Sequence, residues 1–183
     1  MSVYHIPVLL NESVSALNIS ENPNGIFVDA TFGGGGHSRE ILSRLGPKGK
    51  LIAFDRDSDA IANAPDDKRL ILIHNNFRFI QNFVHTLGYL GKVDGILADL
   101  GVSSHQFDTG ERGFSFRFDA PLDMRMNQLA KISAADIVNT YSQEDLTRIF
   151  KTYGEVEKPW KAAELICSAR EKGAINTTGD LSK

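Results

Sequence analysis

Short apolar runs alternate with helical patterns along the first hundred residues. The runs that we expect to form strands cover residues 26–29, 51–54, 70–73 and 93–100. Between them, apolar positions that recur on one face predict helices over 37–45, 58–64 and 79–87. Strands that are apolar along their whole length are typical of a parallel sheet covered on both faces. The pattern therefore predicts an α/β fold with a doubly wound parallel sheet, in the strand order 3-2-1-4.

The pattern changes after residue 101. Residues 102–125 are rich in Gly, Ser, Phe and Arg and show no helical stripe. Helix start signals follow, since Ser133 and Ser142 each precede an aspartate by three residues, as in a capping box. We therefore expect a sheet domain over 1–101 that holds the ligand, and a small, mostly helical subdomain over 102–183.

Composition excludes several classes of protein. The chain has 183 residues, of which 42% are hydrophobic, so it can bury a core and is no disordered tail. A single cysteine, Cys167, permits no internal disulfide and suits a reducing compartment. No apolar run of 18 residues is present, so we expect a cytoplasmic protein without a membrane segment. The net charge of −3 argues against a protein that grips duplex DNA, and the five histidines show no metal-ligand spacing.

A glycine-rich loop follows the first predicted strand. Asp29 ends that strand, and glycines occupy positions 33–36 before the next helix. Glycine is needed where a ligand must approach the backbone closely. A dinucleotide fingerprint starting at the first of these glycines would need a sixth-place glycine where Ser38 stands. The run instead fits the D-x-G-x-G-x-G loop of S-adenosylmethionine-dependent methyltransferases, with Thr31 at the first glycine place, and the alternative is a turn that binds no ligand.

Three further residues follow predicted strands. Asp55 closes the second strand, where a carboxylate can accept both hydroxyl hydrogen bonds of a ribose, or can cap the next helix. Phe77 follows the third strand, where it can cover an adenine or belong to the core. Asp99 ends the fourth strand, where its side chain is expected to face the crevice at which the strand order reverses.

An aromatic segment over 112–118 alternates Phe with polar residues, including Arg112 and Arg117. Such a segment can stack unpaired bases and meet phosphates. The alternative is an extended segment with one buried aromatic face.

Several longer motifs make the chain similar to a known family. They are His5-Ile6-Pro7-Val8-Leu9-Leu10, Asp29-Ala30-Thr31-Phe32-Gly33 with Gly36-His37-Ser38, Phe54-Asp55-Arg56-Asp57, Asp94-Gly95-Ile96-Leu97-Ala98-Asp99-Leu100-Gly101-Val102-Ser103-Ser104, Glu111-Arg112-Gly113-Phe114-Ser115-Phe116, Pro121-Leu122-Asp123-Met124-Arg125-Met126 and Tyr153-Gly154-Glu155. On these motifs the chain resembles the ribosomal RNA small subunit methyltransferase H family, which methylates the N4 amine of a cytidine in 16S rRNA.

The resemblance implies a Rossmann-like class I methyltransferase fold with an inserted helical substrate domain. It also implies S-adenosylmethionine as cofactor and 16S rRNA in the small ribosomal subunit as partner. The cofactor-binding residues that it implies are Gly35, Gly36, His37, Asp55, Phe77, Asp99 and Gln106. It assigns no catalytic residue. The rival classes are a nicotinamide-dependent oxidoreductase and a non-catalytic RNA-binding module.

Two features indicate that the sequence is part of a longer enzyme. Thr177 begins another helix pattern three residues before Asp180, close to the last residue, Lys183. The strand over 93–100 is apolar along most of its length, yet in a four-stranded sheet it would be an edge. We therefore expect cofactor binding with poor methyl transfer, and self-association, as in a homodimer, through that strand.

Overall fold

The computed structural model describes residues 7–183 and divides the chain into two compact units. The first unit ends at Ser103 and the second covers Ser104–Lys183, whereas the sequence placed the boundary after residue 101. His5 and Ile6, which open one of the sequence motifs, lie outside the described residues. Among the described residues, no helix is long and apolar enough to cross a membrane.

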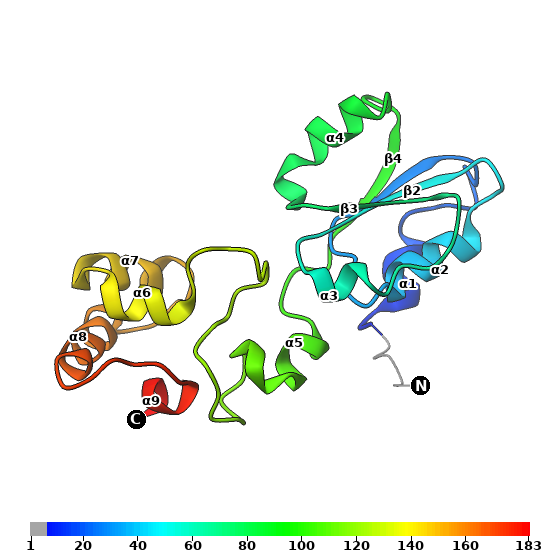
Figure 1. Cartoon of the computed structure of the whole chain (residues 1–183). Coiled ribbons are helices and arrows are strands. Elements are labelled where there is room, and N and C mark those ends of the chain that lie inside the picture. Colours follow the sequence, from blue (N-terminus) through cyan, green and yellow to red (C-terminus); the bar gives the residue numbers. More distant parts are fainter. Residues whose placement is uncertain (1–6) are drawn as a thin grey trace. The chain divides into compact units, whose positions relative to one another are not determined.

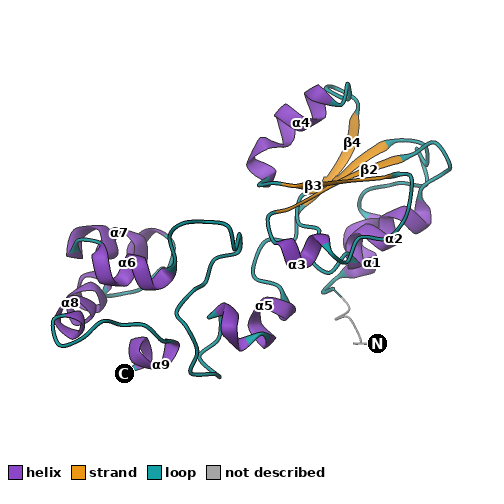
Figure 2. Ribbon diagram, in the orientation of Figure 1, coloured by secondary structure: helices purple, strands orange, loops and turns teal. Residues whose placement is uncertain are grey.

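The first unit is built on a four-stranded sheet in which every neighbouring pair is parallel (Figure 2). The strands are β1 (Ile26–Asp29), β2 (Lys50–Asp55), β3 (Leu70–His74) and β4 (Val93–Leu97). Their order is β3-β2-β1-β4, so the predicted fold class and strand order are confirmed. All four carboxyl ends therefore lie along the same edge of the sheet, with β1 and β4 as neighbours.

Helices cover both faces of this sheet (Figure 1). The helices of this unit are α1 (Leu10–Ser15), α2 (Gly36–Arg44), α3 (Ser58–Ile61), the 3-10 turn η1 (Phe77–Phe79) and α4 (Ile80–Thr86). Alternation along each strand divides the core in two: Phe27 packs with α1 and α2, and its neighbour Val28 packs with α4. Both clusters contain fully buried strand residues, which is why the strands read as continuous apolar runs.

Two predicted elements are shorter in the structure. The fourth strand ends at Leu97 instead of residue 100, because the backbone N–H of Asp99 donates to the Thr31 hydroxyl and leaves the sheet ladder. The helix expected over 58–64 ends at Ile61. Within the described residues β4 pairs with β1 alone, so the predicted pairing of this edge with a second copy stays a prediction.

The second unit consists of short helices and loops (Figure 1). Its elements are α5 (Ser104–Asp108), η2 (Gly110–Arg112), α6 (Ala134–Thr140), α7 (Gln143–Thr152), α8 (Pro159–Arg170) and α9 (Thr178–Ser182). The capping box of Ser133 and Asp136 is complete. At the start of α7, the Ser142 hydroxyl accepts from the Asp145 N–H, but the described contacts include no bond from the Ser142 N–H back to the Asp145 carboxylate. The expected helix after Thr177 is present and carries a complete capping box.

Candidate functional site

The loop after β1 is tied to the ends of the two strands beside it. Its first residue, Ala30, donates its N–H to the carbonyl oxygen of Leu97 at the end of β4, at 2.8 Å. Two residues later, the N–H of Phe32 donates to the Phe54 carbonyl in β2, also at 2.8 Å. These bonds fix the loop across the carboxyl edge of the sheet, where ligands of such sheets bind.

Glycines give this loop its backbone shape. Gly33 and Gly35 have φ angles of 52° and 76°, in the left-handed region that disfavours other residues. A Cβ on Gly36 would lie 2.3 Å from the Cγ of Pro7, so only glycine fits there without a shift. Gly35 is the N-cap of α2, and within the described chain no side chain caps that helix. The first-turn N–H groups of α2 are therefore available to a ligand acceptor.

Asp29 anchors the loop from the end of β1. Its carboxylate is fully buried and accepts hydrogen bonds from the Ser38 hydroxyl at 2.7 Å and the Thr31 N–H at 3.0 Å. Burial raises the pKa of Asp29 above its usual value, against the smaller opposing effect of these bonds. Both oxygens point to partners within the loop and helix α2, so we interpret Asp29 as an internal support.

His37 is a buried residue in the first turn of α2, and its two ring nitrogens differ in their surroundings. Its Nδ1 lies 4.0 Å from Oδ2 of Asp99. Its Nε2 is buried and has no hydrogen-bond partner among the residues that the structure describes. An unpaired buried polar atom is costly and needs an explanation. A polar ligand group at this edge of the sheet would supply the missing partner, so the site fits a bound polar cofactor.

Asp55 lies at the end of β2 and faces the glycine loop. Its Oδ2 accepts from the Gly33 N–H at 2.7 Å, and its Oδ1 accepts from the Asp57 N–H at 2.9 Å. Asp57, and not Asp55, caps helix α3, so the alternative of a helix cap at Asp55 is wrong. The carboxylate is half-buried, and each oxygen keeps a lone pair that can accept a further hydrogen bond.

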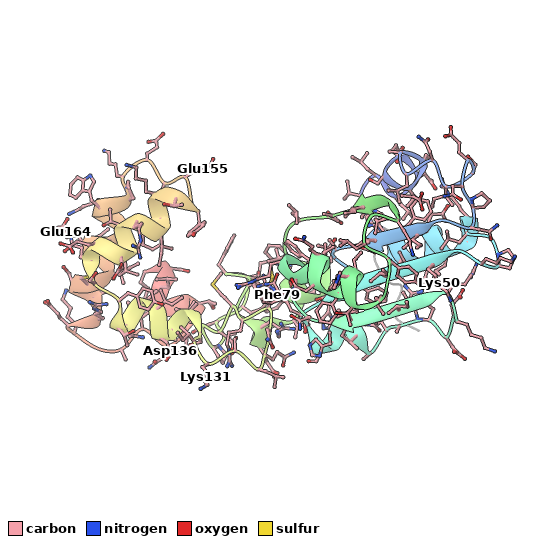
Figure 3. All side chains as sticks on the ribbon, turned by 90° about the horizontal axis from the view of Figure 1, so that it is seen from above. Lys50, Phe79, Lys131, Asp136, Glu155 and Glu164 are labelled. Atoms are coloured by element: carbon pink, nitrogen blue, oxygen red, sulfur yellow. The ribbon has the colours of Figure 1, made fainter. Side chains whose placement is uncertain are left out.

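Phe77 opens the 3-10 turn after β3 and is 41% exposed, so the alternative of a core phenylalanine is wrong. The side chain of Asn76 caps this turn by accepting from the Arg78 N–H. The Arg78 guanidinium lies over the ring of Phe79, 4.6 Å from its centroid. Phe79 is the residue before α4 and is labelled in Figure 3. An exposed flat ring after β3 can stack on a base at the carboxyl edge of the sheet.

Asp99 follows β4 with a side chain that is 61% exposed. Its backbone N–H donates to Oγ1 of Thr31 at 2.7 Å. The structure thus brings His37, Asp55 and Asp99 to one edge of the sheet. Sequence reasoning missed the role of Thr31, and the signal that could have found it was the departure of this residue from the glycine of the D-x-G-x-G-x-G pattern.

Gln106 belongs to the second unit, on α5, and its side chain is buried. The two units are described separately, so the assignment of Gln106 to the cofactor stays a prediction. Among residues 7–183, no three His, Cys, Asp or Glu side chains gather as a metal ion would require.

The aromatic segment fits neither interpretation at every residue. Arg112 is buried, and its Nη2 donates to the carbonyl of Arg125 at 2.9 Å, so it braces a loop and is not presented to RNA. The aromatic face is not buried either, because Phe116 is 87% exposed. Ser115 is buried instead, and its hydroxyl accepts from the Arg117 N–H. Arg117 is 57% exposed and pairs with Asp108.

The chain is similar in sequence to known proteins along almost its whole length. The sequence model described as MraW methylase family matches residues 2–183. A ribosomal RNA small subunit methyltransferase H of Parabacteroides distasonis is 55% identical over 179 residues, which are 98% of this chain and 58% of that protein. The protein of the same name from Bacteroides fragilis is 56% identical over 98% of this chain and 58% of its own length. That from Flavobacterium johnsoniae is 57% identical over 98% and 59%. The chain thus spans under three fifths of the length of these relatives.

Proposed function

The chain belongs to the MraW methylase family, and on this premise we propose that it carries the S-adenosylmethionine site of an rRNA methyltransferase. The proposed reaction transfers a methyl group to the N4 amine of a cytidine in 16S rRNA of the small ribosomal subunit. The relatives named as ribosomal RNA small subunit methyltransferase H support this substrate. Family membership does not favour a nicotinamide oxidoreductase or a non-catalytic RNA-binding module.

The buried, unpartnered Nε2 of His37 carries the proposal for the cofactor. It lies in the first turn of α2, beside backbone N–H groups that no described side chain caps. We assign Gly35, Gly36 and His37 to the part of the cofactor nearest this helix, since polar cofactor groups can accept from the helix N–H groups. Asp55 would accept the ribose hydroxyls, and the exposed ring of Phe77 would cover the adenine.

The chain contributes orientation more than chemical activation. Bound S-adenosylmethionine would supply an electrophilic methyl group on a sulfonium. The task of the protein is then to hold a weakly nucleophilic amine in line with that methyl group. Asp99 is exposed at the end of β4, and its carboxylate can accept a hydrogen bond from the amine and so orient its lone pair. RNA access requires that the target base leave its stack.

Calorimetry with the 183-residue chain tests the cofactor. We expect one S-adenosylmethionine per chain and no binding of NAD at the same concentration. Binding of NAD alone would favour the oxidoreductase, and binding of neither nucleotide would contradict the proposed function.

The substrate is tested with a methyl-labelled cofactor and small ribosomal subunits that lack the modification, with large subunits as the control. We expect slow labelling of 16S rRNA only, and label on protein would contradict the RNA assignment.

A further inference from the structure

We propose that Thr31 is a positioning residue that holds Asp99 at the cofactor edge of the sheet. This inference rests on the proposed function, together with the assignment of Asp99 to the cofactor-binding residues that the family resemblance implies. The observation behind it is the 2.7 Å hydrogen bond from the Asp99 backbone N–H to Oγ1 of Thr31, which joins residues 68 positions apart. Thr31 stands where the D-x-G-x-G-x-G loop has a glycine, and a glycine has no side-chain acceptor.

The Thr31 hydroxyl is held in place from several sides. The Thr31 N–H donates to the buried Asp29 carboxylate, which also accepts from Ser38 in α2. The residues on either side of Thr31 bond to the carbonyls of Leu97 and Phe54, in the two strands that flank β1. A β-branched side chain on a fixed backbone has few rotamers, so Oγ1 is a rigid acceptor.

Asp99 lies beyond the last residue pair of the sheet, so no ladder hydrogen bond fixes its backbone. The ladder between β1 and β4 ends with the pairing of Asp29 and Leu97, two residues before Asp99. Two residues after it, Gly101 has a φ of 152°, a conformation that side-chain-bearing residues rarely adopt. The Thr31 bond is therefore what fixes the Asp99 backbone beyond the strand, and with it the approach of the Asp99 carboxylate to the His37 ring.

Amide hydrogen exchange tests the bond without any cofactor. In Thr31→Val, which keeps the shape but removes the acceptor, we expect the Asp99 amide to exchange at least tenfold faster. In Thr31→Ser, which keeps the hydroxyl, we expect exchange within threefold of the wild type. Thr31→Ala repeats the test should the valine variant fail to fold, and unchanged Asp99 exchange in a folded variant without the hydroxyl would overturn the proposal.

A double-mutant cycle with S-adenosylhomocysteine, the demethylated cofactor, tests whether Thr31 acts through the Asp99 carboxylate. We expect Thr31→Val to weaken binding at least fivefold when Asp99 is present and less than twofold in the Asp99→Ala background. Thr31→Ser should bind within twofold of the wild type. A merely structural role for Thr31 would weaken binding equally in both backgrounds.

The outcomes separate this inference from the proposed function. Binding by the wild type with equal losses in the two backgrounds would overturn the positioning role and leave the proposed function intact. A wild type that binds neither S-adenosylmethionine nor S-adenosylhomocysteine would overturn the proposed function, and the positioning role with it.

Discussion

The sheet unit and the helical unit differ in how far the hydrogen-bonding capacity of their polar side chains is used within the unit. In the sheet unit, polar groups at the strand ends are held in place yet keep capacity for a ligand, as the unpartnered Nε2 of His37 and the exposed carboxylate of Asp99 show. In the helical unit, conspicuous polar residues such as Arg112 and Asp123 bond to neighbours within the unit. A polar motif in a sequence therefore marks a site only where the fold leaves its bonding capacity unused.

The largest expected effect is at the glycine loop of the sheet unit. In Gly35→Ala, the new Cβ would lie 2.8 Å from the Phe32 ring and 2.9 Å from Nη1 of Arg39, on a backbone with φ of 76°. Left-handed strain and overpacking together should cost about 2–5 kcal/mol of stability. Cofactor binding should be lost as well, measured by calorimetry.

Gly88→Ala is the matched control for that variant. Gly88 has a φ of 78°, but no described atom outside Gly88 and its two chain neighbours lies within 4 Å of the point that a Cβ would occupy there, so backbone strain alone remains, about 1–2 kcal/mol. Cofactor affinity should not change in this variant. Equal losses of stability in Gly35→Ala and Gly88→Ala would show that the glycine loop is not closely packed.

Arg112→Ala should produce the largest change in the helical unit. The guanidinium is buried against backbone carbonyls and lies over the Phe114 ring, 5.9 Å from its centroid. Its removal should cost about 2–4 kcal/mol, because hydrogen bonds to a charged group and packing around its stem are both lost. The fluorescence of Trp160, the one tryptophan of the chain, reports unfolding of this unit.

Arg117→Ala is the contrasting variant, because its ion pair with Asp108 is exposed and should cost less than about 0.5 kcal/mol. We expect this variant, and not Arg112→Ala at a temperature where it is folded, to weaken the salt-dependent binding of single-stranded RNA. The opposite result would restore the prediction that Arg112 meets RNA.

Asp55→Ala should weaken cofactor binding by a factor on the order of ten to a hundred, since a charge-assisted pair of hydrogen bonds contributes about 1.5–3 kcal/mol. Asp57→Ala is the matched control: it removes the cap of α3 and should cost about 1 kcal/mol of stability with unchanged affinity. Asp55→Asn keeps an acceptor for the Gly33 N–H and so separates support of the loop from contact with the ribose. Unchanged affinity in folded Asp55→Ala would contradict the ribose assignment.

The elements that local pattern controls could be predicted from the sequence, and those that distant partners control could not. The parallel sheet follows from continuous apolar runs and crossover handedness, and its strand order is the common doubly wound one, which the structure has. The end of β4 depends on a hydroxyl 68 residues away, so the apolar run overstated the length of the strand. Burial of Arg112 depends on carbonyls more than ten residues further along the chain, which no local spacing reveals. The spacing of residues along the chain likewise gives no reason to group Gln106 with the other proposed cofactor residues.

A modest effect is expected at a motif that the two units share. Arg69 and Arg125 each form an ion pair with the aspartate two residues earlier, Asp67 and Asp123, with Nη2 to Oδ2 distances of 2.6 Å. In each arginine, the Nη1 group also donates a hydrogen bond to a backbone carbonyl at 2.7 Å. The hydrogen bonds from Arg69 lower the pKa of Asp67 to about 2, and those from Arg125 lower the pKa of Asp123 in the same direction.

A carboxylate whose pKa is lower in the folded state stabilises the fold above its unfolded pKa, and this stabilisation is lost as the pH falls towards the folded pKa. Arg69→Lys should therefore cost at most about 1 kcal/mol at pH 7, because lysine cannot form the paired geometry. The difference in the free energy of unfolding between this variant and the wild type should narrow as the pH falls from about 4 towards about 2. Urea titrations monitored through the amide exchange of β3 measure this difference. Arg125→Lys should show the same trend through Trp160 fluorescence. A difference that stays constant down to about pH 3 in both variants would show that neither pair stabilises its unit through charge.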